Sequence, residues 1–431
     1  MAAPASAFQP PTVASTVRGL AGIVLTVILS GCGNNADAYD PAHALVASSH
    51  SATSSESVLY SFTGGNDGGN AATGLVFDGN GNLYGTTVTG GTSQCGTVFK
   101  LTPTASPPWQ DSVLHSFGCY ADGKNPHGGV SFDRHGNLDG TTVAGGSGGS
   151  CSSDGCGILF QLTPKTENVL HNFTAGSDGF GPGGGVVFDP SGDIYGMTPD
   201  GGSHSEGTIY EVWRAGRQWH EKIIHAFTGG TDGGVGSLGL LRRDTAGNLY
   251  GVTEIGGAHG AGTVFKLHVT SKKRWRLTTL YAFKGPPDGD SPYGGLVADG
   301  GGDLYGTTYY GGADGLGAVF ELARNARGGY RERVLYSFRG YSDGSSPTAT
   351  LILQNAELYG TTSAGGGSCG CGTIFEVVAS SGSETVLHAF GNGSDGAYPY
   401  YGLTPDARGN FYGATVAGGS FGQGTVYEFT P

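Results

Sequence analysis

The sequence predicts an all-β fold, a seven-bladed β-propeller of four-stranded blades. An anchor tripeptide, Leu-Tyr-Gly in four of its seven copies, begins at residues 83, 138, 194, 249, 304, 358 and 411. A period of 53 to 56 residues is typical of stacked or radially arranged repeats. Glycine supplies 84 of the 431 residues, and no long segment shows helical spacing of apolar residues. Short strands joined by tight turns are therefore expected.

The chain opens with a predicted lipoprotein signal peptide over residues 1–31. Arg18 is its single charge, an apolar run covers residues 20–29, and Leu-Ser-Gly-Cys ending at Cys32 resembles the lipobox of bacterial lipoproteins. Acylation of Cys32 would anchor the protein in a membrane; an ordinary signal peptide with an incidental cysteine is the alternative. Residues 32–56 are rich in Ala, Ser and Asn and form a predicted flexible tether.

Residues 57–431 form the predicted propeller, in which each period contains four strand-like runs. These runs are short, rich in β-branched and aromatic residues, and bounded by Gly, Asp and Asn. The fourth, outermost run first occurs at residues 58–62, ahead of the first full unit, whereas the last unit ends at residues 425–429 without one. The leading run is therefore predicted to complete the last blade, which closes the ring and leaves no open end blade.

The repeat also resembles a known family. Gly-Asn-Leu-Tyr-Gly-Thr-Thr, then Gly-Gly, then Gly-Thr-Val-Phe-Lys-Leu, intact over residues 81–101, is similar to the GloVer tandem repeat of exported bacterial proteins that vary in their surface anchor. Two departures are Asp139, which replaces the anchor tyrosine, and a first hairpin shortened at residues 355–358. The resemblance implies export and surface attachment but no reaction. We therefore expect an envelope protein, on the periplasmic side of the outer membrane or on the cell surface.

The charge of the chain bears on its partners. A net charge of −13 repels phosphate backbones, so nucleic acid is not an expected partner. The expected partners are a membrane, through the acylated cysteine, and a glycan or another envelope protein. A monomer is expected.

An Asp-Gly pair follows every outer run. A ring of seven carboxylates is consistent with calcium, which takes six to eight oxygens. A turn role is favoured, because Asp accepts a hydrogen bond from a backbone N–H two residues on while Gly supplies a positive φ. No cofactor is therefore expected. The aspartates are Asp67, Asp122, Asp178, Asp232, Asp288, Asp343 and Asp395.

Function is expected where the blades differ. Loops between blades and loops between second and third strands share one face, and the fifth to seventh units place aromatic side chains there. Such rings are suited to stack on sugars or apolar ligands; packing against neighbouring blades is the alternative. The residues are Tyr293, Tyr309, Tyr310, Tyr341, Tyr398, Tyr400, Tyr401 and Phe421.

The third and fourth units place imidazoles and carboxylates in the same face. Two imidazoles and two carboxylates from adjacent blades would be able to bind a transition metal or to act as acid and base. No metal-binding spacing supports this, so exposed loop residues are favoured. The four residues are His204, Glu206, Glu254 and His259.

Six cysteines remain besides the lipobox cysteine, and export to an oxidising compartment allows disulfides. Two lie in loops of the same face of the first unit, two flank a short segment of one loop, and two are separated by a single glycine. Six free thiols are the alternative. The predicted pairs are Cys95 with Cys119, Cys151 with Cys156, and Cys369 with Cys371.

The leading interpretation is a lipid-anchored binding scaffold of the cell envelope. An extracellular polysaccharide lyase or hydrolase is the main alternative, and it requires His and acidic side chains within hydrogen-bond reach at the channel mouth. A mainly structural envelope protein is a third, which predicts a face with neither a pocket nor an aromatic patch.

Overall fold

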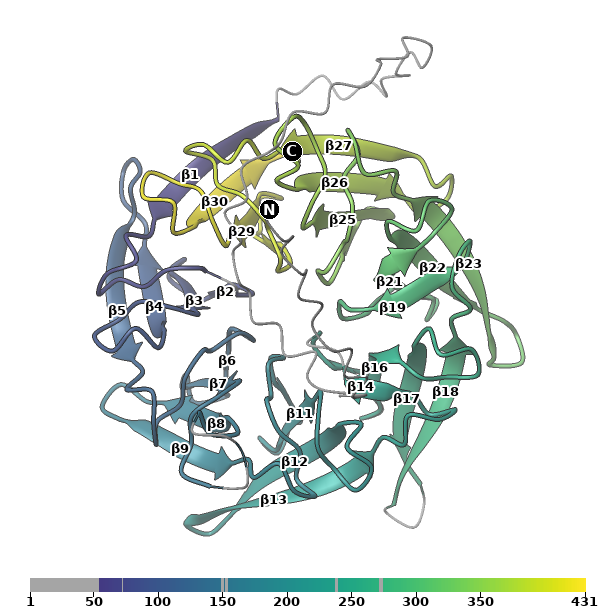
Figure 1. Ribbon diagram of the computed structural model, residues 1–431, viewed down its shortest axis with the longest axis horizontal. Coiled ribbons are helices and arrows are strands. Elements are labelled where there is room, and N and C mark those ends of the chain that lie inside the picture. Colours follow the sequence, from purple (N-terminus) through teal and green to yellow (C-terminus); the bar gives the residue numbers. More distant parts are fainter. Residues whose placement is uncertain (1–53, 72, 149–150, 152–153, 237–238, 271–273) are drawn as a thin grey trace, which may run out of the picture. The chain divides into compact units, whose positions relative to one another are not determined.

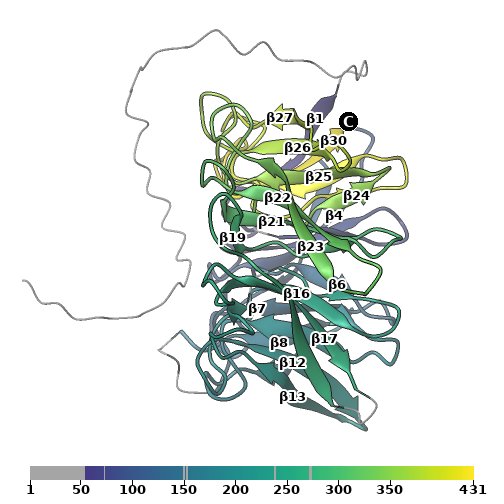
Figure 2. The same cartoon turned by 90° about the vertical axis from the view of Figure 1, so that its right-hand side faces the viewer.

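The computed structural model describes residues 54–71, 73–148, 151, 154–236, 239–270 and 274–431. Together they form seven antiparallel sheets arranged as a ring (Figures 1 and 2), which confirms the predicted propeller. In this described part of the chain, no helix is long and apolar enough to cross a membrane. The predicted signal peptide, Cys32 and the tether up to residue 53 lie outside the described residues.

Each blade runs from a first strand at the channel to a fourth strand on the circumference. Blades 4 and 5 have one additional short strand on the channel side. The strands of blades 1 to 3 are β2 (Val76–Phe77), β3 (Leu83–Thr87), β4 (Thr97–Thr102) and β5 (Gln110–Ser116); β6 (Val130–Phe132), β7 (Leu138–Thr142), β8 (Ile158–Leu162) and β9 (Glu167–Asn172); and β10 (Val187–Phe188), β11 (Ile194–Thr198), β12 (Thr208–Ala215) and β13 (Gln218–Ala226). Those of blades 4 and 5 are β14 (Gly234–Gly236), β15 (Arg242–Arg243), β16 (Leu249–Ile255), β17 (Thr263–Val269) and β18 (Trp275–Ala282); and β19 (Gly289–Pro292), β20 (Val297–Ala298), β21 (Leu304–Gly311), β22 (Ala318–Arg324) and β23 (Tyr330–Ser337). Those of blades 6 and 7 are β24 (Ile352–Gln354), β25 (Glu357–Thr362), β26 (Thr373–Val378) and β27 (Glu384–Ala389); and β28 (Thr404–Pro405), β29 (Phe411–Ala414), β30 (Thr425–Thr430) and β1 (Ser55–Ser61).

The ring is closed by β1, as the repeat phase predicts. β1 pairs antiparallel with β30, with Val58 opposite Tyr427 and Ser61 opposite Thr425. The strand begins at Ser55, two residues before the predicted start of the propeller at residue 57. The first and last segments of the propeller therefore share one sheet, and the edge of β30 is covered.

Aromatic pairs hold neighbouring blades together. The phenylalanine that ends each outer strand packs edge-on against a third-strand ring of the next blade; Phe62 and Phe99, for example, have centroids 5.1 Å apart. Such pairs add to the stabilisation that comes from burying their area. The same ring explains the glycine of the anchor tripeptide, because a Cβ on Gly85 would lie 2.7 Å from Cζ of Phe99. The pairs are Phe62–Phe99, Phe117–Phe160, Phe173–Tyr210, Phe227–Phe265, Phe283–Phe320, Phe338–Phe375 and Phe390–Tyr427.

The repeated Asp of each inter-blade loop makes a turn by a route different from the predicted one. Each accepts a hydrogen bond from the backbone N–H four residues before it, at 2.8–3.2 Å, rather than from an N–H two residues on. Each also faces a Tyr or His seven residues earlier in its own outer strand. The His–Asp contacts are His115–Asp122, His171–Asp178, His225–Asp232 and His388–Asp395, and the Tyr–Asp hydrogen bonds are Tyr60–Asp67, Tyr281–Asp288 and Tyr336–Asp343.

A second carboxyl group, from the outer strand of the next blade, lies near the turn Asp at six of the seven junctions. One oxygen of each is buried without a hydrogen-bond partner among the described residues. Burial, with the neighbouring turn Asp adding to it, raises the pKa of most of these groups to about 7, and that of Asp111 to about 6. Leu277 stands at the equivalent position of blade 4. The six groups are Glu56, Asp111, Glu167, Glu221, Glu332 and Glu384.

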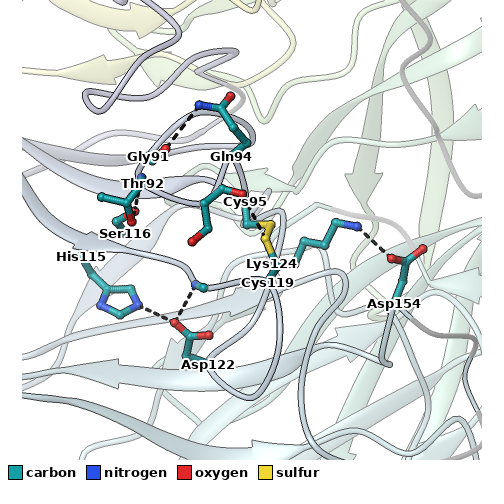
Figure 3. Close-up of a disulfide and its surroundings, with 12 residues drawn as sticks. Gly91, Thr92, Gln94, Cys95, His115, Ser116, Cys119, Asp122, Lys124 and Asp154 are labelled. Carbon is teal, nitrogen blue, oxygen red and sulfur yellow. Dashed lines mark hydrogen bonds and ion pairs between the residues drawn. A yellow bond between two sulfur atoms is a disulfide. The ribbon is translucent and has the colours of Figure 1, made fainter.

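All three predicted disulfides are present. They join Cys95 to Cys119, Cys151 to Cys156, and Cys369 to Cys371. Figure 3 shows the first, which ties the loop before β4 to the loop after β5, beside the His115–Asp122 contact. Each bridge therefore fastens loops of the face on which the blades differ.

Candidate binding site at the channel mouth

Two variable positions of the repeat meet on this face at the mouth of the channel. The first lies five residues after the repeated Asp, where most blades differ and three carry His127, Tyr293 and Tyr400. The second directly follows the threonine pair of the second strand; three blades have valine there, whereas blades 4 and 5 have Glu254 and Tyr309. With Tyr401, which follows Tyr400, these residues are here called the mouth cluster: His127, Glu254, Tyr293, Tyr309, Tyr400 and Tyr401.

The additional strands of blades 4 and 5 hold part of the mouth cluster in place. β14 pairs with the upper end of β16, which carries Glu254, and β19 pairs with the upper end of β21, which carries Tyr309. Tyr293 directly follows β19. Side chains on paired strands are positioned more rigidly than side chains on free loops.

Tyr401 lies across the channel mouth. Its loop leads into blade 7, yet its hydroxyl lies 3.4 Å from Nδ1 of His127, whose loop leads into blade 2, so blade 1 lies between the two loops. The backbone carbonyl groups of Tyr400 and Tyr401 accept hydrogen bonds from Thr348 and Thr361 at 2.6 and 3.3 Å. On the other side, the rings of Tyr293 and Tyr309 have centroids 6.2 Å apart.

A cavity of about 220 Å³ lies at this level of the channel. Tyr293, Tyr400 and Tyr401 line it, together with apolar residues that directly precede the first strands, such as Leu351 and Leu403. Glycines form much of the remaining wall because neighbouring blades come close there; a Cβ on Gly128 would lie 2.5 Å from the backbone of Gly184. The cavity is thus mainly apolar with a few convergent polar groups, as is common for small-molecule sites.

Burial holds Glu254, His127 and three tyrosines of the mouth cluster uncharged near neutral pH. Burial raises the pKa of Glu254 to about 8, and the Asp200 carboxyl adds to the effect. Burial lowers the pKa of His127 to about 4. Burial also raises the pKa of Tyr293, Tyr400 and Tyr401 above the usual range. The mouth cluster is therefore a neutral set of hydrogen-bonding groups and aromatic rings.

The structure divides the eight predicted aromatic residues into two groups. Tyr293, Tyr309, Tyr400 and Tyr401 belong to the mouth cluster, as described above. Tyr398 packs against the core next to the Cys369–Cys371 bridge, in agreement with the packing alternative. The remaining three are well exposed and line no part of the channel cavity; they are Tyr310, Tyr341 and Phe421, with 53%, 88% and 60% of their surface exposed.

The four weak metal or acid–base candidates do not come together. His204 and His259 are exposed, and Glu206 lies over Gly234, whose Cβ would be 2.6 Å from its Oε2. Among the described residues, no group of three or more His, Cys, Asp or Glu side chains is placed to hold a metal. Glu254 is the exception in location, because it belongs to the mouth cluster.

Sequence reasoning missed His127 and Asp200. His127 occupies the same repeat position as Tyr293 and Tyr400, five residues after the repeated Asp. A comparison of all seven loops at that one position would have found it. Asp200 lies next to the position of Glu254 in the preceding blade, and its role depends on the contact between blades rather than on a motif.

Comparison with solved structures gives likenesses of fold. The extracellular domain of a hybrid two-component system from B. thetaiotaomicron has a TM-score of 0.50 at 13% identity, over 88% of this chain and 41% of that one. A protein titled a 6-phosphogluconolactonase from Bacteroides uniformis has a TM-score of 0.47 at 14% identity, over 74% and 84% of the two chains. At such identities only the fold is shared, and the chain spans less than half the length of the first.

Comparison at the level of sequence identifies a family. No curated protein matches the chain. The model of the Gloeobacter/Verrucomicrobia repeat matches residues 149–365 and 276–431, which is more than half of the chain. The chain therefore belongs to the Gloeobacter/Verrucomicrobia repeat family, the family that its repeated motif resembles.

Proposed function

We propose that this protein is an envelope-anchored propeller that binds an uncharged glycan at its channel mouth. The observation that carries the proposal is a cavity lined by Tyr293, Tyr400 and Tyr401. A neutral imidazole, that of His127, lies beside Tyr401, and a protonated carboxyl group, that of Glu254, lies near Tyr293. Tyrosine rings offer flat apolar faces for sugar rings, and their hydroxyl groups need partners when buried. A site without net charge suits a ligand without net charge, because no buried charge is left unpaired.

The carboxyl groups at the mouth favour a binding function over a catalytic one. A glycoside hydrolase commonly uses two carboxyl groups whose pKa values are pushed apart, so that one is protonated and the other ionised. Here burial raises the pKa of Glu254 and of Asp200 alike. The pair thus lacks the division of roles that hydrolysis requires. A purely structural role is disfavoured because it predicts neither the cavity nor the aromatic lining.

Glycan-array binding with the purified chain tests the proposal. We expect retention of one or a few neutral oligosaccharides, and loss of that retention in Tyr400→Ala. The matched control is Tyr341→Ala, which removes an exposed aromatic ring of the same face outside the cavity and should leave binding unchanged. No retention by the wild-type chain, or equal loss in both variants, would contradict glycan binding at the mouth.

The anchor is tested separately. Metabolic labelling with a palmitate analogue should modify the wild-type chain and fail on Cys32→Ala, because the lipobox places the acyl group on that cysteine. Equal labelling of both chains would exclude the proposed lipid anchor and leave the binding proposal intact.

A further inference from the structure

A second cavity, of about 320 Å³, lies between blades 2 and 3. The turns β6–β7 and β10–β11 and the end of β12 form its walls. The β6–β7 and β10–β11 turns join first to second strands, and β12 ends at the turn that joins the third strand to the fourth. The cavity therefore lies on the face opposite the channel mouth. The glycan proposal makes no use of this cavity.

The cavity exists where blade 2 departs from the repeat. In blades 1 and 4 the anchor tyrosine donates a hydrogen bond to the Asp of the first hairpin; the Tyr250 hydroxyl lies 3.2 Å from Asp244 Oδ2. A lysine ammonium group completes the arrangement, since Nζ of Lys266 lies 5.3 Å from the centre of the Tyr250 ring. Blade 2 has Asp139 in place of the tyrosine and Gln161 in place of the lysine. Both the ring and the ammonium group are missing from this blade.

The carboxyl groups that remain lack a strong positive partner. Asp139 is fully buried, and the Gln161 amide donates to it at 3.1 Å and to Asp133 at 3.3 Å. The nearby arginines are engaged elsewhere: Arg134 donates to His135 at 3.2 Å, and Arg214 lies 5.9 Å from the centre of the Trp219 ring. Burial, with Asp133 adding to it, raises the pKa of Asp139 to about 8. A nearby cation would reverse this effect.

We propose that the cavity binds a small organic cation, a primary ammonium group on a short flat or aliphatic body. The ammonium group faces Asp133 and Asp139, where blade 4 places its own lysine. The body occupies the space of the absent tyrosine, between Phe188 and Trp219. The ligand thus supplies the two groups that blade 2 lacks.

Binding should depend on pH in a defined direction. Near pH 7 most Asp139 is protonated in the empty cavity, so binding of the ammonium group requires release of that proton. Affinity should therefore rise about tenfold per pH unit between pH 6 and 8 and level off above pH 8, while the ammonium group itself stays protonated. The charged or titratable groups that face Asp139 are Asp133, Arg134 and His135 of the β6–β7 turn, Asp193 of the β10–β11 turn, and Arg214 of β12.

Calorimetric titration of the full chain with phenethylamine and 2-phenylethanol tests the proposal. The two probes share one body and differ in the charged group. At pH 8 we expect saturable binding of the amine and at least about tenfold weaker binding of the alcohol, since hydrogen bonds to charged groups are the stronger ones. Equal binding of both probes, or no saturable binding of the amine, would overturn the proposal.

Variants locate the site. Asp139→Tyr restores the residue of the other six blades and fills the cavity, so it should abolish amine binding. Asp139→Asn keeps the shape, and should weaken binding and flatten the pH profile. Asp314→Asn, an exposed loop carboxylate, is the matched control and should bind as the wild type does. Unchanged binding by Asp139→Tyr, or an unchanged pH profile in Asp139→Asn, would place the amine elsewhere and overturn the proposal.

Discussion

The circumference and the channel mouth of this propeller are served by the same inter-blade loops, yet they differ in how far the blades agree. At the circumference each loop contains an Asp-Gly pair whose Asp accepts the same backbone hydrogen bond in all seven blades. Five residues further on, at the channel, the blades carry different residues, among them His127, Tyr293 and Tyr400. The repeated contacts stabilise the ring, and the residues that differ between the blades form the proposed binding site.

The largest expected effect comes from opening the ring at its closure. Deletion of residues 55–62 removes β1 together with Phe62, which exposes the edge of β30 and leaves Phe99 without its partner ring across the junction. We expect the melting temperature measured by circular dichroism to fall by more than about 10 °C, with aggregation through the free edge. An unchanged melting temperature would show that the closing strand is dispensable.

A smaller effect is expected from pH, and the junction carboxyl groups of the circumference contribute to it. Five of the six carboxyl groups at the blade junctions have folded pKa values near 6 to 7, above the unfolded values of about 4. A raised pKa means that the folded state binds the proton more tightly than the unfolded state. The contribution of these groups to the free energy of unfolding is therefore complete at low pH and is lost as pH rises through about 7. Because these groups are partly exposed, solvent screening reduces the effect, and we expect a fall on the order of 5 °C in melting temperature from pH 5 to pH 8.

A single-site variant sharpens the pH test. Glu167→Gln should raise the melting temperature at pH 8 and leave it nearly unchanged at pH 5, because it removes a charge that is present only at the higher pH. Leu277→Gln at the junction of blade 4, where no carboxyl group stands, is the control and should shift both values alike. A Glu167→Gln variant whose melting temperature differs from that of the wild type by the same amount at pH 5 and at pH 8 would contradict this account of the junctions.

The comparison also shows which features the sequence made predictable. The blade count, the closing strand and the disulfides depend on motifs that recur within one unit or on neighbouring loops, so local pattern was sufficient. The first hairpin of blade 6 is similar: Asn355 and Ala356 both adopt positive φ, which suits the two-residue turn that the shortened segment requires.

What was missed depends on contacts between units. The contact between Tyr401 and His127 joins residues 274 positions apart, and the junction carboxyl groups meet aspartates of the preceding blade. To predict the cavity beside Asp139, the replacement of the anchor tyrosine by Asp139 has to be considered together with Gln161 on the next strand. Each of the three arises from which blades are neighbours and which face a loop occupies, and none can be predicted from a single motif.

The central claim is that residues which differ between the blades bind the glycan, whereas residues repeated in every blade stabilise the ring. Paired variants of the two regions test this claim most directly. For an oligosaccharide selected on the array, affinity by calorimetry and melting temperature would be measured for Tyr400→Ala at the mouth and Asp232→Asn at the circumference. We predict that Tyr400→Ala weakens binding at least about tenfold with a shift in melting temperature within about 2 °C. Asp232→Asn, which disturbs the contacts of Thr228 and His225, should keep affinity within about twofold and lower the melting temperature by roughly 2–4 °C. Undiminished affinity in Tyr400→Ala, or lost affinity in Asp232→Asn with the fold intact, would contradict the account.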